Sequence, residues 1–342
     1  MKVVVTGGSG YFGELLCIQL LERGHEVLNL DVNKNSDVDP RITFIEADIR
    51  DYDRVAQACS GIDVVYHNVA QVPLAKDRHL FDSVNRTGTE NILKAAIETG
   101  VKRLVYTSSS AVFGIPEKNP VLESTLPTPM EAYGKAKYDG ELLCKEYADK
   151  GLDVAIVRPR TILGHGRLGI FQILFEWVFT GKNIPVLNGG NNIYQFVHAE
   201  DLGNACILAA EKPGFNIYNC GADEFDSMKS MLDTLCRHAN TGSTVKSLPM
   251  WPVVIGMKIS SALGMSPLGA YHAMMYGRSM YFDISKARKE LGWNPRYSND
   301  EMIIEAYDWY VLNRDRVLTN DSGSHHKKKL KQGVLKIVSQ LL

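Results

Sequence analysis

The chain has 342 residues, of which 45% are hydrophobic and 23% charged, so it can bury a large core as one domain or two lobes. Its formal net charge of −1 at pH 7 argues against nucleic acid as the main partner. Six scattered cysteines without a CxxC pair predict a reduced, cytoplasmic protein without disulfide bonds, and we expect no metal site. No apolar run is long enough to span a bilayer, and a strand expected from residue 2 leaves no room for a signal peptide.

Strand-like and helix-like segments alternate through the first half of the chain. Apolar runs predict strands at 2–6, 26–30, 42–46, 63–67, 102–107 and 153–158. Helical patterns lie between them at 11–23, 51–59, 87–100 and 131–150. Because helix-length segments separate the strands, we expect an α/β fold, a doubly wound parallel sheet of the Rossmann type. Its ligand should lie at the carboxyl ends of the strands.

After about residue 160 the pattern loosens. Helices are predicted at 168–181, 284–291 and 299–313, and a strand-like segment at 279–282. We expect residues 1–165 to form the Rossmann domain, with 194–215 returning to it, and 166–193 and 216–315 to form a smaller substrate-binding lobe.

The last residues, 320–342, differ in composition from the rest. A basic cluster is followed by apolar residues at helical spacing. One interpretation is a basic amphipathic helix in which 325–342 contacts an anionic membrane surface or a partner. The other is a frayed helix packed on its own domain, or a partly disordered tail, since Gly333 weakens a helix.

The turn after the first predicted strand carries three glycines at a spacing of three, Gly7, Gly10 and Gly13, and a helical pattern follows it. Such a turn lets backbone N–H groups and a helix N-terminus approach a pyrophosphate. The second predicted strand is followed by Asp31, which could accept hydrogen bonds from a ribose 2′-hydroxyl and would repel a 2′-phosphate. The sequence therefore predicts a dinucleotide site that prefers NAD to NADP.

Tyr133 and Lys137 are four residues apart near the start of a predicted helix, so their side chains share one face. A nearby ammonium and a nicotinamide cation would favour the phenolate, so we expect a pKa for Tyr133 below the usual value of about 10. The hydroxyl cluster 107–110 ends a predicted strand, where the site of an α/β protein belongs. This pair therefore indicates acid–base chemistry.

The chain resembles the extended short-chain dehydrogenase/reductases, the NAD-dependent epimerase/dehydratase family, over about residues 1–315. The resemblance rests on the glycine turn, Asp31 and Tyr133/Lys137, and on further motifs along the chain: 48–49, HNVA (67–70), 84–89, YTSSSAVFG (106–114), Arg158-Pro159, FVHAEDL (196–202) and FDISKARKELGW (282–293). This family includes nucleotide-sugar epimerases and 3β-hydroxysteroid dehydrogenase-like enzymes.

The resemblance implies a set of roles. NAD would be bound by Gly7, Gly10, Tyr11, Phe12, Gly13, Asp31, Asp48, Ile49, Val69, Ala70, Asn85, Thr107, Tyr133, Lys137 and Arg158. Ser109 would hydrogen-bond the reacting substrate oxygen, Tyr133 would move the proton and Lys137 would tune Tyr133. His198 and Asp201 are expected to give structural support, and a homodimer would form through the helices at 87–100 and 131–150.

Departures from the family pattern bear on the substrate. Ser110 and Ala111 stand where sugar dehydratases carry two acids, so we expect no water elimination. By the same resemblance, an epimerase usually has Asn where Thr161 stands, and Arg just before the FVH segment, where Tyr194 and Gln195 stand. The candidate substrate residues are Val72, Ser109, Arg160, Thr161, Arg167, Tyr194 and Arg278, and the three arginines could replace the missing clamp on a diphosphate.

The leading hypothesis is an NAD-dependent nucleotide-sugar epimerase. The alternative is a 3β-hydroxysteroid or β-hydroxy/β-keto lipid dehydrogenase, in which the Met-rich and aromatic segment 249–282 would line an apolar pocket. Met and aromatic residues at such spacing more often form ordinary core, which is the other interpretation of this segment. A protein that binds NAD without turnover is a third possibility, which the intact Ser109, Tyr133 and Lys137 disfavour.

Overall fold

A computed structural model describes residues 1–35, 39–70, 82–169, 171–249 and 277–319. Val72, most of the Met-rich segment and the tail 320–342 lie outside the described residues, so the predictions made for them remain predictions. Within the described ranges, no helix has both the length and the apolar character needed to cross a bilayer.

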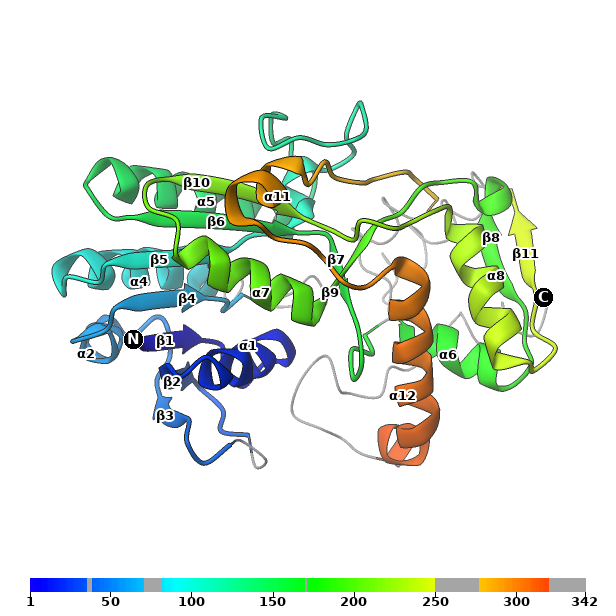
Figure 1. Ribbon diagram of the computed structural model, residues 1–342, viewed down its shortest axis with the longest axis horizontal. Coiled ribbons are helices and arrows are strands. Elements are labelled where there is room, and N and C mark those ends of the chain that lie inside the picture. Colours follow the sequence, from blue (N-terminus) through cyan, green and yellow to red (C-terminus); the bar gives the residue numbers. More distant parts are fainter. Residues whose placement is uncertain (36–38, 71–81, 170, 250–276, 320–342) are drawn as a thin grey trace.

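The main body is a seven-stranded parallel sheet with the strand order β10-β6-β5-β4-β1-β2-β3 (Figure 1). Its strands are β1 (Lys2–Thr6), β2 (Glu26–Asp31), β3 (Thr43–Glu46), β4 (Val64–His67), β5 (Arg103–Thr107), β6 (Val154–Pro159) and β10 (Asn216–Cys220). The order reverses direction at β1, which places a switch point between β1 and β4 at the carboxyl edge of the sheet.

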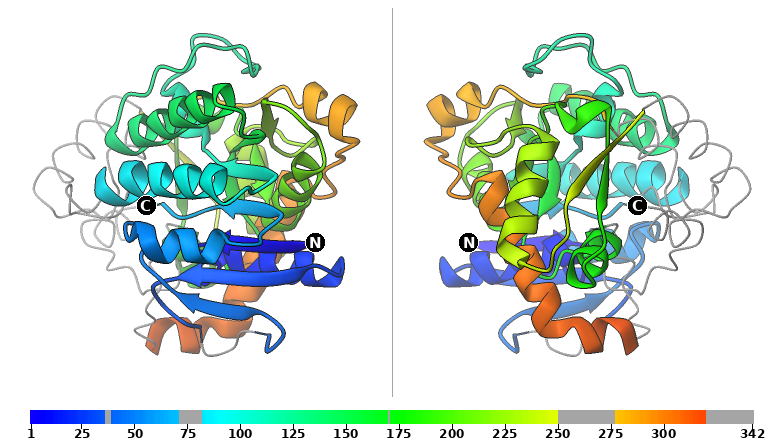
Figure 2. Two further views of the ribbon diagram at one scale, coloured as in Figure 1. Left: turned by 90° about the vertical axis from the view of Figure 1, so that its left-hand side faces the viewer. Right: turned by 90° about the vertical axis from the view of Figure 1, so that its right-hand side faces the viewer.

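Helices cover both faces of this sheet (Figures 1 and 2). Helices α1 (Tyr11–Glu22) and α7 (Ala199–Ala210) pack together on one face, and α2 (Tyr52–Cys59), α4 (Gly88–Glu98) and α5 (Ala132–Asp149) pack side by side on the other. Successive side chains of a strand point to opposite faces of the sheet, so each strand contributes to two apolar clusters. In β1, Val3 and Val5 belong to the cluster under α1, and Val4 belongs to the cluster under α4. Near-continuous apolar strands are what a sheet covered on both faces requires.

The second half of the chain adds shorter elements around a third apolar cluster. The strands are β7 (Thr161–Leu163), which pairs with β9 (Phe196–His198), and β8 (Ile184–Leu187), which pairs with β11 (Val245–Leu248). The helices are α6 (Phe171–Phe179), α8 (Met228–Ala239), α11 (Ser285–Leu291) and α12 (Asn299–Thr319), with a short helical turn η3 (Asn188–Gly190). Two further helical turns, η1 (Ser83–Thr87) and η2 (Ser110–Phe113), lie in the first half of the chain. Helices α6, α8 and α12 pack on one another.

The predicted fold class is confirmed, and the predicted elements of the first half match the observed ones within about two residues at each end. Two expectations for the second half were wrong. Residues 279–282 form no strand, because Met280 and Phe282 make only single bridges, to Tyr194 and Val121. In addition, β10 pairs with β6 in the main sheet, so the return to the Rossmann domain extends beyond 215.

The sequence analysis did not predict helix α7 or strand β10, for different reasons. Most of α7 is buried between the sheet, α1 and α11, so its sequence carries no clear polar face. Strand β10 contains asparagines that usually disfavour strands. The amide of Asn219 is buried, and its Nδ2 atom donates to the Val121 carbonyl (3.2 Å).

Trp293 anchors the connection between α11 and α12, and it tests the packing of that region. Its side chain is fully buried, and its indole N–H donates to the Asp201 carbonyl (2.9 Å). We expect Trp293→Ala to lower the free energy of unfolding by about 3–5 kcal/mol, measured by urea denaturation. Leu312→Ala, at a side chain that is 85% exposed, should cost less than about 0.5 kcal/mol. Equal losses in the two variants would contradict this packing.

Candidate active site

The glycine-rich turn between β1 and α1 is folded tightly on itself. Gly7 has a φ of +72°, and its N–H donates to the Leu30 carbonyl (2.9 Å). A Cβ atom on Gly13 would lie 2.1 Å from the Gly7 carbonyl oxygen, so no side chain fits there. Gly10 caps α1 with extended backbone and without a capping side chain. The turn therefore presents a helix N-terminus that a side chain would obstruct, which fits a dinucleotide pyrophosphate.

Asp31 ends β2 beside this turn. Its carboxylate accepts hydrogen bonds from the backbone N–H groups of Ser9 (3.1 Å) and Asn33 (3.0 Å). Burial raises the pKa of Asp31, and these N–H donors oppose the rise. The carboxylate is thus tied to the turn at the position where the sequence predicts an adenosine ribose.

The other residues predicted to bind the cofactor lie around the same edge of the sheet. Val69 contacts the turn closely, since a Cβ atom on Gly7 would lie 3.2 Å from its Cγ2 atom. Asp48 forms an ion pair with Arg50, which lowers the pKa of the Asp48 carboxyl. Phe12, Ile49 and Asn85 are buried, whereas Tyr11 and Ala70 are half-buried.

A chain of buried polar side chains joins the neighbouring strand ends. Thr6 Oγ1 lies 2.8 Å from His67 Nδ1, and His67 Nε2 lies 3.1 Å from Thr89 Oγ1. Burial lowers the pKa of His67 to about 3, which keeps the ring neutral. On the next strand, Thr107 Oγ1 donates to Asn68 Oδ1.

Ser109, Tyr133 and Lys137 gather where β5 ends and α5 begins. The Ser109 side chain lies close enough to Tyr133 to lower the pKa of the Tyr133 hydroxyl. The carboxylate of Glu131 caps α5 by accepting from the N–H groups of Tyr133 (2.7 Å) and Gly134 (2.5 Å). Helix α5 approaches η2 closely, because a Cβ atom on Gly134 would lie 2.3 Å from the Ala111 carbonyl oxygen.

The side chain of Lys137 is buried beneath this pair. Its ammonium donates to the Thr107 carbonyl (2.7 Å) and lies 4.9 Å from the centre of the Tyr106 ring. Burial lowers the pKa of Lys137 to about 8.

The protein's own groups raise the pKa of Tyr133, so the low pKa expected beside a nicotinamide cation stays a prediction. Burial raises the pKa of Tyr133, and the charge of Glu131 adds to the rise. The hydrogen bond from Ser109 and the charge of Arg167 oppose it. The Lys137 ammonium is directed at the Thr107 carbonyl.

Arg158 was predicted to contact the cofactor, yet each of its three side-chain nitrogens donates a hydrogen bond inside the protein. Its Nε and Nη2 atoms donate to the two oxygens of Glu141 (2.8 and 2.6 Å), and its Nη1 atom donates to the Glu123 carbonyl (3.2 Å). These contacts are structural, and a role in cofactor binding stays a prediction.

The candidate substrate residues fall into separate places. Arg160 is only 1% exposed, lies between the rings of Tyr194 (4.7 Å) and Phe282 (5.6 Å), and donates to Ser110 Oγ (2.7 Å). Thr161 and Tyr194 are hydrogen-bonded to each other (2.9 Å). In the described part of the chain, the Nε and Nη2 atoms of Arg160 are buried without a hydrogen-bond partner.

The two other arginines lie elsewhere. Arg167 stacks on the Tyr11 ring, 5.3 Å from its centre, and its charge acts on Tyr133. Arg278 is exposed. The described residues show no contact that joins the three arginines into one diphosphate clamp.

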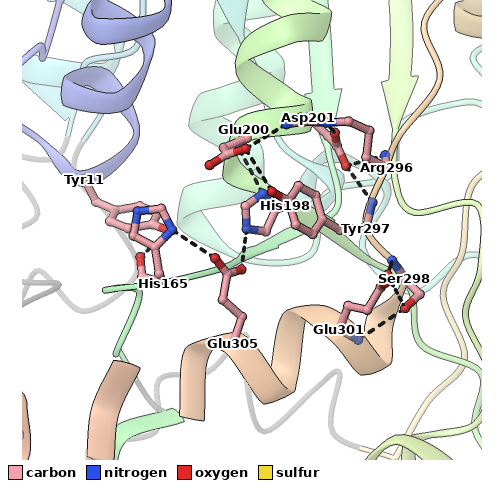
Figure 3. A network of polar contacts seen from close by, with 10 residues as sticks. All are labelled: Tyr11, His165, His198, Glu200, Asp201, Arg296, Tyr297, Ser298, Glu301 and Glu305. Atoms are coloured by element: carbon pink, nitrogen blue, oxygen red, sulfur yellow. Dashed lines mark hydrogen bonds and ion pairs between the residues drawn. The ribbon is translucent and has the colours of Figure 1, made fainter. Parts of the chain in front are cut away.

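One network near the site was missed by the sequence analysis (Figure 3). Glu305 of α12 binds His198 Nε2 (2.8 Å) and His165 Nδ1 (3.2 Å), and the Tyr11 hydroxyl donates to the His165 carbonyl (3.1 Å). These side chains come from four distant segments, so no local spacing could have revealed the set. Asp201 accepts from the backbone N–H groups of Arg296 and Tyr297, which matches its expected structural role.

The three side chains His165, His198 and Glu305 could hold a metal ion by distance alone, since their ligand atoms lie within 4.8 Å of one another. Their hydrogen bonds favour another interpretation. His198 Nδ1 accepts from the Glu200 N–H (3.2 Å), so Nε2 carries the hydrogen and donates to Glu305. A metal-bound histidine instead donates from its second nitrogen. The cluster is therefore best described as a hydrogen-bonded network between the glycine turn and α12.

The chain belongs to the NAD dependent epimerase/dehydratase family, an enzyme family, whose sequence model matches residues 3–221. It is similar to the uncharacterized protein y4nG of Sinorhizobium fredii, at 56% identity over 340 residues, 99% of this chain and 86% of that protein. It is also similar to a 3-beta-hydroxysteroid dehydrogenase of Mycolicibacterium neoaurum, at 29% identity over 341 residues and 91% of each chain.

Among solved structures, UDP-glucose 4-epimerase of Thermotoga maritima with UDP-glucose matches with a TM-score of 0.77. The two chains are 22% identical, and the match covers 92% of this chain and 100% of that one. This likeness supports the fold, and the family membership predicted from the sequence is confirmed.

The Glu305 network predicts a pH-dependent contribution to stability. The hydrogen bonds and charges of the two histidines lower the pKa of Glu305 to about 2, against the effect of burial, so this contribution is present above about pH 4.5 and is lost as the pH falls toward 2. Glu305 raises the pKa of His165, so that contribution is present below about pH 6.5 and is lost above the raised value. Both contributions are present between about pH 4.5 and 6.5.

We therefore expect Glu305→Gln to destabilise the protein more at pH 5.5 than at pH 9, as measured by urea denaturation. The pH-dependent part should be about 1 kcal/mol or less, because His165 and Glu305 are partly exposed. His165→Gln should remove most of this pH dependence. A loss in Glu305→Gln that is the same at both pH values would reject the ion pair.

Proposed function

We propose that the protein is an NAD-dependent oxidoreductase that oxidises and re-reduces one carbinol carbon of a nucleotide-linked sugar, and so acts as an epimerase. The observation that carries the proposal is the grouping of Ser109, Tyr133 and the buried Lys137 where β5 ends and α5 begins, with the Lys137 ammonium bound to the Thr107 carbonyl. The glycine turn lies at the same edge of the sheet.

The residues present fit the cofactor that the family name implies. Gly7, Gly10 and Gly13 leave room for a pyrophosphate that a Cβ atom would fill, and Asp31 would hold the adenosine ribose. In this proposal, the bound cofactor is also contacted by Asp48, Ile49, Val69, Ala70 and Asn85. Bound NAD would supply the hydride acceptor, and the reduced form the hydride donor.

The protein's own residues would carry the proton chemistry. Ser109 would orient the substrate hydroxyl through a hydrogen bond. Tyr133 would take the hydroxyl proton during oxidation and return it during reduction. The buried position of Tyr133 disfavours its phenolate, while Ser109 and Arg167 favour it, so the proton affinity reflects opposing effects.

Two features support epimerisation rather than dehydration. Ser110 and Ala111, which follow Ser109 directly, are buried and carry no carboxyl group for water elimination. Arg167 lies beside Tyr11 and acts on Tyr133, where a guanidinium could bind an anionic group of the substrate. Thr161 and Tyr194 would line the same pocket.

A second candidate function is a 3β-hydroxysteroid or β-hydroxy lipid dehydrogenase. The observation in its favour is Arg160, which is enclosed by Tyr194, Phe282 and Ser110 instead of facing a diphosphate. The similarity to a 3-beta-hydroxysteroid dehydrogenase is consistent with this candidate.

The proposal extends to assembly. We propose a homodimer that pairs α4 and α5 across a twofold axis, and this would cover Leu142 of α5, which is 52% exposed. Light scattering after size-exclusion chromatography should give twice the chain mass. A monomer at micromolar concentration would reject the dimer.

Turnover assays distinguish the two substrates. With UDP- and GDP-hexoses, an epimerase forms the 4-epimer without net NADH, whereas a dehydrogenase given NAD and a 3β-hydroxysteroid accumulates NADH. We expect 4-epimer formation and a loss of about 100-fold or more in kcat for Tyr133→Phe, with NADH binding retained. No turnover of any sugar nucleotide, or full activity in Tyr133→Phe, would contradict the proposal.

Asp31 tests the choice of cofactor. We expect Asp31→Ser to weaken NADH binding about tenfold or more and to raise the affinity for NADPH relative to NADH, because a charged hydrogen-bond acceptor is lost. Titration of NADH and NADPH fluorescence measures both. Tighter binding of NADPH than NADH by the unaltered protein would refute the assignment.

A further inference from the structure

Glu141 of α5 is a buried carboxylate for which the sequence analysis proposed no role. It is 4% exposed, and both its oxygens accept from Arg158 of β6 in a two-pronged ion pair (2.8 and 2.6 Å). One oxygen also accepts from Ser108 Oγ (2.6 Å). The carboxylate thus joins α5 to the ends of both β5 and β6.

The position of Glu141 relates it directly to the proposed catalytic residues. Tyr133, Lys137 and Glu141 follow one another at intervals of four residues on α5, so they share one face of the helix. Lys137 binds the Thr107 carbonyl, and Glu141 binds the side chain of the next residue, Ser108. Two successive turns of α5 are therefore fastened to the two residues that precede Ser109.

Lys137 is buried, so charged groups near it strongly affect how easily it loses its proton. Tyr106 of β5 and His67 of β4 face it from the sheet, and Cys144 and Glu141 lie on its own helix. Arg158 of β6 stands behind Glu141. Burial lowers the pKa of Lys137, whereas Cys144 and the charge of Glu141 raise it. In such a poorly solvated place a single charge has a large effect.

We propose that Glu141, held by Arg158, is a positioning residue that fixes the Ser108–Ser109 segment and supplies a negative charge one helical turn from Lys137. The part of this inference that concerns Ser109 and Lys137 in catalysis rests on the proposed function. The link between Glu141 and Lys137 is a property of the folded protein and is testable without a substrate.

The first test follows the titration of Lys137 by NMR. Full-length protein labelled with ¹³C at the lysine Cε atoms gives one resonance that disappears in Lys137→Met, which assigns it. Glu141→Gln keeps the shape of the side chain but leaves the Arg158 charge uncompensated, so the Lys137 midpoint should fall by about one pH unit. Arg158→Gln leaves the negative charge of Glu141 uncompensated and should raise the titration midpoint of Lys137.

Arg158→Lys is the matched control, since it keeps the positive charge and should leave the midpoint near that of the unaltered protein. Circular dichroism and thermal unfolding identify any variant that has lost its fold. Opposite shifts in Glu141→Gln and Arg158→Gln support the inference, because a purely structural role moves both in the same way. No shift, or shifts of equal sign in folded variants, overturns it.

The second test uses turnover once a substrate is identified. We expect Glu141→Gln to lower kcat about tenfold or more with little change in KM, and the pH–rate profile should move in the same direction as the Lys137 midpoint. An unchanged kcat and pH profile would overturn the positioning role. Opposite NMR shifts without turnover of any tested substrate would instead count against the proposed function alone.

Discussion

The site depends on a buried ion pair that fastens α5 to the carboxyl edge of the sheet. Glu141 and Arg158 are almost inaccessible to water, and removal of one partner from such a pair costs about 3–5 kcal/mol, because the other charge is left buried. The same carboxylate holds Ser108, and Lys137 one turn earlier holds Thr107. Close contact between Gly134 and Ala111 completes the docking of α5. Ser109 and Tyr133 can meet only because these contacts fix the helix relative to β5.

The glycine turn reaches this cluster through a second set of contacts. Asp31 accepts from Ser9 and ties the turn to β2, and Tyr11 donates to the backbone of His165, which follows β7. Glu305 then joins His165 and His198 to α12 (Figure 3). The turn, the segment after β7 and the last described helix are therefore mechanically connected. A ligand that contacts Tyr11 or Arg167 would therefore contact a region that hydrogen bonds already hold to β2 and to α12.

Local patterns in the sequence predicted the first half of the fold well, because strands and helices depend on local spacing. Glycines three apart, strands ending in polar residues and a Tyr–Lys pair four apart each have a direct structural meaning. The partners of buried charges could not be predicted in this way. Arg158 and Glu141 are 17 residues apart, and Glu305 lies 107 residues from His198, so only the folded chain brings them together. The effect of the protein's own groups on the pKa of Tyr133 could not be predicted for the same reason, since burial and the direction of the Lys137 ammonium are tertiary properties.

The central claim is that the carboxyl edge of the sheet binds NAD with its reactive end beside Tyr133. A crystal structure of the full chain grown with NADH tests this most directly. The account predicts the adenine beside Asp48 and Ile49, the pyrophosphate at the glycine turn, and the nicotinamide within reach of Tyr133 and Lys137. A dinucleotide bound elsewhere on the protein, or a nicotinamide directed away from Tyr133, would contradict it.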